Sequence, residues 1–342
     1  MDLDAYDFEL PAELIAQEPP AERDGGRLLC VPRAGGPLAH RRVRDLPALL
    51  DPGDLLVVNV TRVLPARLRG HKDSGGAAEA LLLGPGPAPD SYEAFLKTSG
   101  RQRVGQKLAF EGRGARFEAE VVALPGDGRV VLRFEPGVSP YAAGEAPLPP
   151  YIRREASDPA DDARYQTVFA REAGAVAAPT AGLHLSDRVL EELAARGVER
   201  AEVVLHVGPG TFQPLQEEQL RSKRLHVERF ELPDVTADAI AAARERGNRV
   251  VAVGTTSTRV LESCASGDGN VAAARGTTDL FLTPGDPFQV VDALLTNFHL
   301  PRSSLLLLVA ALIGRERLLD AYREAIAERY RFYSYGDAML IQ

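Results

Sequence analysis

The C-terminal half of the chain alternates amphipathic segments with short, continuous apolar runs. The segment 186–197, SDRVLEELAARG, starts with polar residues, spaces its apolar residues like a helix and ends in glycine, so it predicts a capped helix. The apolar run 201–208, AEVVLHVG, follows it and is typical of a buried strand. A second helix over 236–247, capped by Thr236, and a second strand over 249–254 repeat this order. The repeated alternation predicts an α/β fold, a mostly parallel sheet covered by helices.

Further apolar runs extend this sheet and its helices. The run 54–59, DLLVVN, predicts another strand of the same sheet. The run 305–313, LLLLVAALI, is too short to span a bilayer and predicts a buried helix. The segment 315–330, RERLLDAYREAIAERY, predicts an amphipathic helix near the end of the chain.

The stretch from Arg67 to Pro150 has a different pattern. Short strand-like segments such as ARFEAEVVAL and GRVVLRF are separated by Gly, Pro and Asp, which predicts a small β-barrel or sandwich. A strand of the α/β domain precedes this stretch, and the proline-rich segment 144–154 leads back from it. We therefore expect a discontinuous α/β catalytic domain over 1–66 and 155–342, with an inserted β-barrel domain over 67–154.

Composition and charge narrow the class of protein. The 342 residues are 45% hydrophobic and 26% charged, as in an ordinary globular protein with about two domains. Cys30 and Cys264 form no CxxC motif and fit a reducing compartment, and the N-terminus resembles no signal peptide, so we expect a cytoplasmic protein. The net charge of −8 argues against a general nucleic-acid coat. Short basic clusters leave room for a local patch, although each is also typical of a solvated face.

Five polar segments each follow a predicted strand: 59–68, 176–186, 205–214, 253–263 and 294–304. Ligands of open α/β sheets bind beyond the carboxyl ends of the strands, so we expect these segments to converge on one cleft. The glycines of LHVGPGTF lack the third glycine of a dinucleotide-binding loop, and a tight turn explains them equally well. In GTTSTR, three hydroxyls and an arginine favour binding of a carboxylate or phosphate over simple capping, which needs one hydroxyl.

Four of the six histidines lie in these segments or close after one of them: His184, His206, His226 and His299. No HxxxH or CxxC spacing accompanies them, so we expect no metal site. Imidazole titrates near neutrality, which favours proton transfer beside a polar or anionic substrate. From the residues alone, the interpretation ends at an α/β enzyme with a polar cleft.

Taken together, the motifs resemble a known family. YDFELPAELIAQEP, PGDLLVVNVTRVLPARL, VAAPTAGLHLS, LHVGPGTFQPL, VGTTSTRVLES and VDALLTNFHLPRSS occur in this order nearly from end to end. In this set the chain is similar to the S-adenosylmethionine:tRNA ribosyltransferase-isomerases of queuosine biosynthesis. The resemblance implies an α/β domain joined to an inserted barrel. The chain departs from the family at Val60, where aspartate is usual.

The resemblance also implies a reaction. The family transfers and isomerises the ribosyl group of S-adenosylmethionine onto 7-aminomethyl-7-deazaguanine at the wobble position of tRNA, giving epoxyqueuosine-tRNA, adenine and methionine. S-adenosylmethionine is then a consumed substrate, no cofactor is expected, and the partner is a tRNA anticodon arm. We expect a monomer without membrane contact. A non-catalytic tRNA-binding paralogue and another S-adenosylmethionine-dependent tRNA-modifying enzyme, such as a methyltransferase, are the alternatives.

These segments and their close neighbours supply the candidate residues. The candidates for proton transfer are His184, His206, His226, His299 and Asp279. The candidates for substrate binding are Asn59, Thr61, Arg62, Arg67, Thr180, Gly182, Gly208, Gly210, Thr211, Glu228, Thr255, Thr256, Ser257, Arg259 and Asn297. We expect the Pro-Thr-Ala-Gly turn at 179–182 to let backbone approach the ligand, with His184 at the pocket wall.

Overall fold

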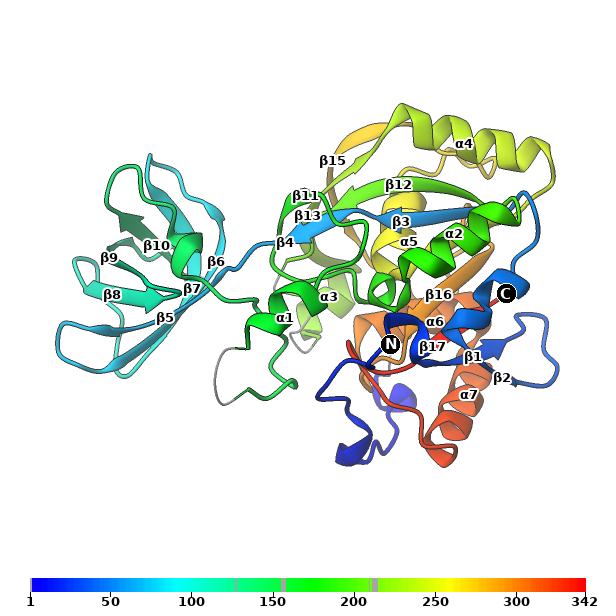
Figure 1. Cartoon of the computed structure of the whole chain (residues 1–342), viewed down its shortest axis with the longest axis horizontal. Helices are drawn as coiled ribbons and strands as arrows, with labels where there is room; N and C mark the ends of the chain where they lie inside the picture. The colour runs from blue at the N-terminus through cyan, green and yellow to red at the C-terminus, as the bar shows by residue number, and fades with distance from the viewer. Residues whose placement is uncertain (1, 127, 155–157, 209, 211–214) are drawn as a thin grey trace.

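The computed structural model describes residues 2–126, 128–154, 158–208, 210 and 215–342. It contains a layered α/β part and a closed barrel, which lies at one end of the molecule (Figure 1). The predicted fold class, α/β with an inserted small barrel, is confirmed.

The α/β part is built on a nine-stranded sheet in the order β15-β13-β12-β3-β14-β16-β17-β1-β2. The strands, in that order, are Ala274–Leu280, Arg224–Leu232, Glu199–Leu205, Leu55–Asn59, Val250–Val253, Ala293–Asn297, Ala338–Ile341, Arg27–Val31 and Ala39–Arg42. Strands β12, β3, β14 and β16 are parallel, as is the pair β17 and β1. The other pairings are antiparallel, so the sheet is mixed rather than mostly parallel.

The central strands are buried on both faces, which explains their continuous apolar runs. Every residue of β3, β14 and β16 is buried. Side chains alternate between two apolar clusters: Leu55 and Val57 of β3 belong to one, and Leu56 and Val58 belong to the other. The first cluster also holds residues of α4, Asp234–Glu245, α5, Gly254–Ser263, α6, Ser304–Ile313, and α7, Arg315–Ala327. The second holds residues of α2, Asp187–Ala195, so helices cover both faces.

Two helix starts test the capping predictions. The polar start predicted a cap at Ser186 or Asp187, and Ser186 caps α2 by accepting a hydrogen bond from the Val189 amide. Helix α4 begins at Asp234, so the prediction that Thr236 caps it is wrong. The Thr236 hydroxyl instead donates to the Glu202 carbonyl at 2.6 Å and ties α4 to β12.

The buried helix predicted over 305–313 is confirmed as α6. In the part of the chain that the structure describes, no helix is long and apolar enough to cross a membrane.

The inserted barrel closes six antiparallel strands in the order β10-β7-β6-β5-β8-β9. In chain order, β5 to β10 are Arg67–Lys72, Ala77–Pro85, Ser91–Thr98, Lys107–Gly112, Ala115–Ala123 and Arg129–Phe134. Its interior is a small apolar cluster of its own, which includes Leu68, Phe110 and Leu132. The chain enters the barrel after β4, Thr61–Val63, and later continues through α1, Pro159–Arg164, to β11, Glu172–Ala175, which pairs with β4 in parallel. The short helix α3, Glu217–Ser222, precedes β13.

Candidate active site

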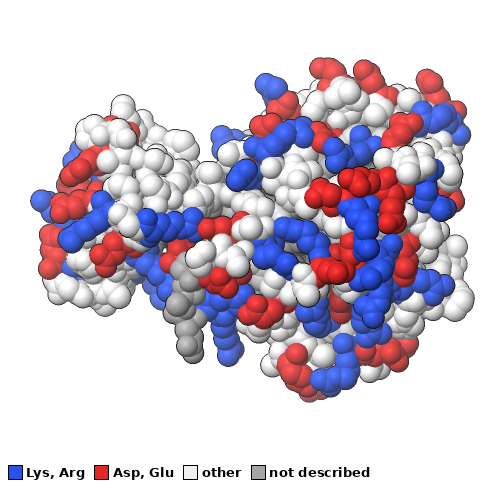
Figure 2. Space-filling model, in the orientation of Figure 1, with Lys and Arg blue, Asp and Glu red and all other residues white. Residues whose placement is uncertain are grey.

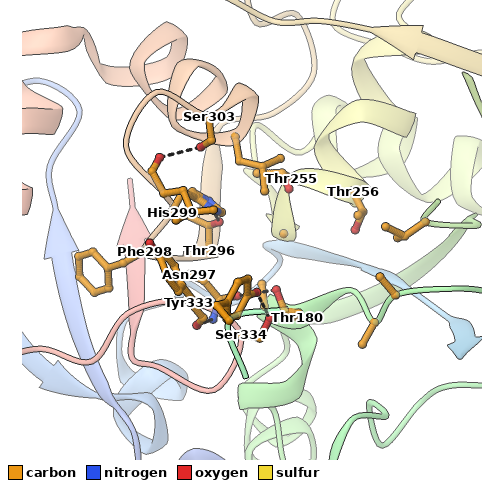
Figure 3. A pocket seen from close by; sticks show the side chains of 18 residues that line it. Thr180, Thr255, Thr256, Thr296, Asn297, Phe298, His299, Ser303, Tyr333 and Ser334 are labelled. Carbon is orange, nitrogen blue, oxygen red and sulfur yellow. Dashed lines mark hydrogen bonds between the residues drawn. The ribbon is translucent and has the colours of Figure 1, made fainter. Parts of the chain in front are cut away.

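A hollow of about 690 Å³, partly open to solvent, lies at the carboxyl ends of β14 and β16. It is lined by the first residues of α5, the loop leading into α6, the 3₁₀ turn Thr180–His184 and the loop before β17 (Figure 3). Its position follows the rule for open α/β sheets, in which ligands bind beyond the carboxyl ends of the strands. Four of the five polar segments reach it: 176–186, 205–214, 253–263 and 294–304.

His299 is the histidine that lines this hollow. Its Nε2 atom lies 2.8 Å from the Thr296 hydroxyl, and its backbone N–H donates to the Tyr322 hydroxyl of α7 at 2.8 Å. Burial lowers the pKa of His299 to about 3. The imidazole is therefore neutral at neutral pH, fixed in orientation and free of a proton on one ring nitrogen.

Asn297, the last residue of β16, connects three segments around the hollow. Its Nδ2 group donates to His184 Nε2 at 2.9 Å and to the Tyr333 carbonyl at 3.0 Å. Its Oδ1 atom accepts from the Thr180 hydroxyl at 3.0 Å. Since an amide nitrogen only donates, His184 Nε2 is the acceptor and its proton sits on Nδ1.

His184 lies behind Asn297 and not at the wall of this hollow, where we expected it. Burial, and secondly the charge of Arg331, lower the pKa of His184 to about 4. Gly182 also has a different role from the one expected. A Cβ atom there would lie 2.8 Å from Thr167 Cγ2 and 2.9 Å from Phe169 Cζ. The glycine thus permits close packing inside the protein, while Thr180 and Ala181 face the hollow.

The start of α5 supplies two of the three predicted hydroxyls. Thr255 and Thr256 line the hollow, and the buried Thr256 Oγ1 has no hydrogen-bond partner among the described residues. Ser257 Oγ donates to the Val253 carbonyl at 2.9 Å, so it is occupied within the helix. Gly254 opens the helix with φ of 85°, a conformation that suits glycine.

A second hollow, of about 370 Å³, adjoins the first through Leu305, which lines both. His226, Glu228, Arg259 and Gly210 line it. Arg259 and Glu228 form an ion pair, with side chains only 7% and 5% exposed. Glu228 Oε1 accepts from the Gly208 amide at 2.8 Å, and Arg259 Nε donates to the Leu280 carbonyl at 3.1 Å.

The first polar segment, 59–68, does not reach either hollow. Asn59 bonds to both the amide and the carbonyl of Leu205, and so joins β3 to β12. The Thr61 hydroxyl lies 3.2 Å from Nδ1 of His206. Burial, and secondly the charge of Arg229, lower the pKa of His206. These polar groups hold together the strands from which the chain passes into the barrel.

Four further candidates lie apart from the two hollows or outside the described residues. Arg62 is exposed on β4. Arg67 donates to the Leu148 carbonyl at 2.7 Å. This bond ties the barrel to residues 144–154, the return segment that leads back to the α/β part. Asp279 on β15 pairs with Arg224 at 2.9 Å. Thr211 lies outside the described residues.

Sequence reasoning missed the aromatic wall of the first hollow. Tyr151 comes from the return segment and Tyr333 from the loop before β17, and their ring centroids lie 4.7 Å apart. The Tyr151 hydroxyl lies 2.6 Å from that of Ser334. Tyr333 has φ of 71°, unusual for a bulky side chain, and bonds from Asn297 and Gly336 to its carbonyl hold it there. The run FYSYG over 332–336, aromatic residues around a serine before a glycine, was the available signal.

Comparison with known proteins gives a consistent result. The profile of a family described as "Queuosine biosynthesis protein" matches residues 3–341. S-adenosylmethionine:tRNA ribosyltransferase-isomerases are similar over the whole chain. One from Anaeromyxobacter sp. (strain Fw109-5) is 53% identical, covering 100% of this chain and 99% of the relative. One from Moorella thermoacetica is 49% identical, covering 100% of both.

A solved structure agrees with these relatives. The crystal structure of S-adenosylmethionine tRNA ribosyltransferase from Thermotoga maritima is 36% identical. The match covers 99% of this chain and 100% of that one, with a TM-score of 0.57.

Proposed function

The chain belongs to the queuosine biosynthesis protein family and is a ribosyltransferase-isomerase that uses S-adenosylmethionine and tRNA, and we propose that its reaction takes place in the first hollow. The acceptor is 7-aminomethyl-7-deazaguanine at the wobble position of the tRNA. The products are epoxyqueuosine-tRNA, adenine and methionine. S-adenosylmethionine is consumed, so the proposal needs no separate cofactor.

The observation that carries this proposal is the absence of charge around the first hollow. Among the described residues that line it there is no Lys, Arg, Asp or Glu, and the pKa of its histidine is lowered to about 3. A sulfonium carries a positive charge, which a protonated imidazole nearby would repel. A neutral His299 avoids that repulsion, and the rings of Tyr151 and Tyr333 offer flat faces to a nucleobase.

His299 is the group that we assign to proton transfer. The reaction starts when a base removes a proton from the ribose carbon next to the sulfonium. Adenine then leaves as its bond to the sugar breaks, and the amine of the acceptor base forms a carbon–nitrogen bond to the sugar. An oxygen of the sugar finally displaces methionine from the carbon that carried the sulfonium, which closes the epoxide. His299 is the imidazole at the wall of the hollow, with Nε2 at 2.8 Å from the Thr296 hydroxyl. Its lowered pKa makes it a weak base, so in this assignment it accepts the proton only transiently and passes it on.

The tRNA contacts are proposed at the junction of the two parts. Arg62 lies on β4, the strand that leads into the barrel, and Arg153 lies on the return segment. Both side chains are exposed. Figure 2 shows basic and acidic side chains intermixed over one face rather than a continuous basic surface. A small number of phosphate contacts fits a chain of net charge −8 better than a long basic groove does.

The test is product analysis with purified protein, S-adenosylmethionine and tRNA that carries the acceptor base. Adenine plus methionine supports ribosyl transfer, S-adenosylhomocysteine indicates methylation, and no product indicates binding only. His299→Asn should lower the rate of adenine release by about 10²–10⁴-fold. His71→Asn, in the barrel, is the matched control and should keep the wild-type rate. An active His299→Asn enzyme would remove His299 from the mechanism.

A further inference from the structure

The second hollow contains a buried cation with an unused donor. Arg259 uses Nε for the Leu280 carbonyl and Nη1 for Glu228. Its Nη2 atom is buried and has no hydrogen-bond partner in the described part of the chain. An unpaired buried donor on a charged group is costly, so an acceptor from outside the protein would stabilise this arrangement.

Arg259 has a defined relation to the first hollow. It follows Thr255 by four residues on α5, so the two side chains lie on the same face of the helix, one turn apart. One helical turn is about 5.4 Å, close to the length of a short aliphatic arm. Thr255 lines the first hollow, Arg259 lines the second, and Leu305 lines both.

We propose that Arg259 binds the carboxylate of the methionine arm of S-adenosylmethionine, with the adenosyl part in the first hollow. This inference rests on the proposed function. Nη2 is the guanidinium nitrogen that is left without a partner, and a carboxylate would accept a charge-assisted hydrogen bond from it. Arg259 is thus a specificity-determining residue for the amino-acid end of the substrate.

The charge of the site favours an amino acid over a phosphate. Glu228 accompanies Arg259 in the same hollow and would repel a multiply charged anion. A zwitterion presents an ammonium group as well as a carboxylate. Its ammonium group complements Glu228 while its carboxylate complements Arg259, so the ion pair matches an amino-acid group as a unit.

The experiment compares S-adenosylmethionine with decarboxylated S-adenosylmethionine, which lacks only this carboxylate. Binding of each to the full-length protein is measured by isothermal titration calorimetry, with and without tRNA. The wild type should bind S-adenosylmethionine about 10- to 100-fold more tightly, the range expected for a charge-assisted hydrogen bond. Equal affinities for the two compounds would overturn the inference, and this comparison needs no variant.

Two variants test whether Arg259 is the source of the preference for S-adenosylmethionine over its decarboxylated form. Arg259→Lys keeps the charge opposite Glu228 but loses the Nη2 donor, and should reduce the preference to a few-fold. Arg275→Gln removes an exposed arginine that pairs with Glu231 on the neighbouring strand, and should keep the full preference. Thermal unfolding checks that both variants are folded. An unchanged preference in a folded Arg259→Lys protein would also overturn the assignment.

The adenine assay separates this inference from the proposed function. Adenine release from S-adenosylmethionine together with equal binding of both compounds would leave the function standing and refute the carboxylate site. A clear binding preference without adenine release would support the carboxylate site and refute the function.

Discussion

His184 should make the stability of the α/β part depend on pH in a measurable way. The imidazole is buried, and its pKa is lowered from 6.5 to about 4, first by burial and then by Arg331. As pH falls below 6.5, His184 becomes protonated in the unfolded chain, whereas in the folded protein it stays neutral until about pH 4. The contribution of this group to stability is therefore present above pH 6.5 and is lost as pH falls toward 4.

The size of the effect follows from the two pKa values. Between about pH 7.5 and about pH 5, a shift of this size removes about 2 kcal/mol from the free energy of unfolding. His184→Asn removes that loss together with the hydrogen bond to Asn297. At about pH 7.5 the variant should be less stable than the wild type by about 1–3 kcal/mol, since a buried bond and some packing are gone. The gap should narrow by about 2 kcal/mol at about pH 5.

The assay is urea unfolding followed by far-ultraviolet circular dichroism at both pH values. The α-helices of the described chain, α1 to α7, lie outside the barrel strands, so this signal reports on the α/β part. His71→Asn, in the barrel, controls for general effects of removing a histidine. The difference between wild type and His184→Asn cancels the carboxylates common to both. A gap that is the same at both pH values would refute the reasoning.

Two further predictions concern Val60 and the tRNA surface. Val60 is 1% exposed within the apolar cluster that includes Phe169 and Val204, so Val60→Asp should lower the free energy of unfolding by about 2–5 kcal/mol without raising the rate of adenine release; a stable and faster variant would show that the usual aspartate of the family takes part in the chemistry. Arg62→Glu and Arg153→Glu should each weaken tRNA binding and make its salt dependence shallower by about one phosphate contact, while S-adenosylmethionine affinity stays the same; equal losses for both ligands would argue against a separate tRNA surface. Arg67 is unsuitable for that test because it bonds to the Leu148 carbonyl.

The sheet was predictable where burial on both faces leaves a continuous apolar run, as in β3 and β14. The antiparallel pairing of the outer strands was not predictable. Strands β13 and β15 have few fully buried positions, Glu228 and Leu232 on β13 and Thr278 on β15, so their pattern gives no direction of pairing. Strand β17 lies between β16 and β1, and its short run AMLI does not reveal that it runs antiparallel to one neighbour and parallel to the other.

The polar segments show the same limit at the site. Asn59 and Asn297 each end a buried strand, and both were expected to face the ligand. The Asn59 side chain forms hydrogen bonds with the backbone of Leu205. Asn297 instead bonds to side chains and backbone at the edge of the first hollow. A buried amide satisfies either kind of partner, and the sequence does not say which is near. The aromatic wall was missed because Tyr333 reaches the hollow only through an unusual backbone conformation.

The place of the insertion has a consequence for a reaction with two substrates of very different size. Strand β3 runs parallel to β14 and ends at the same edge of the sheet, where β14 passes into the start of α5. The chain after β3 continues through β4 into the barrel, as Figure 1 shows, and the return segment brings Tyr151 to the first hollow. The barrel and the small-molecule hollow therefore share one edge of the sheet, and the connecting segments carry both Arg153 and Tyr151. We expect a tRNA arm held at this junction to present its base to the hollow without a large movement of either part.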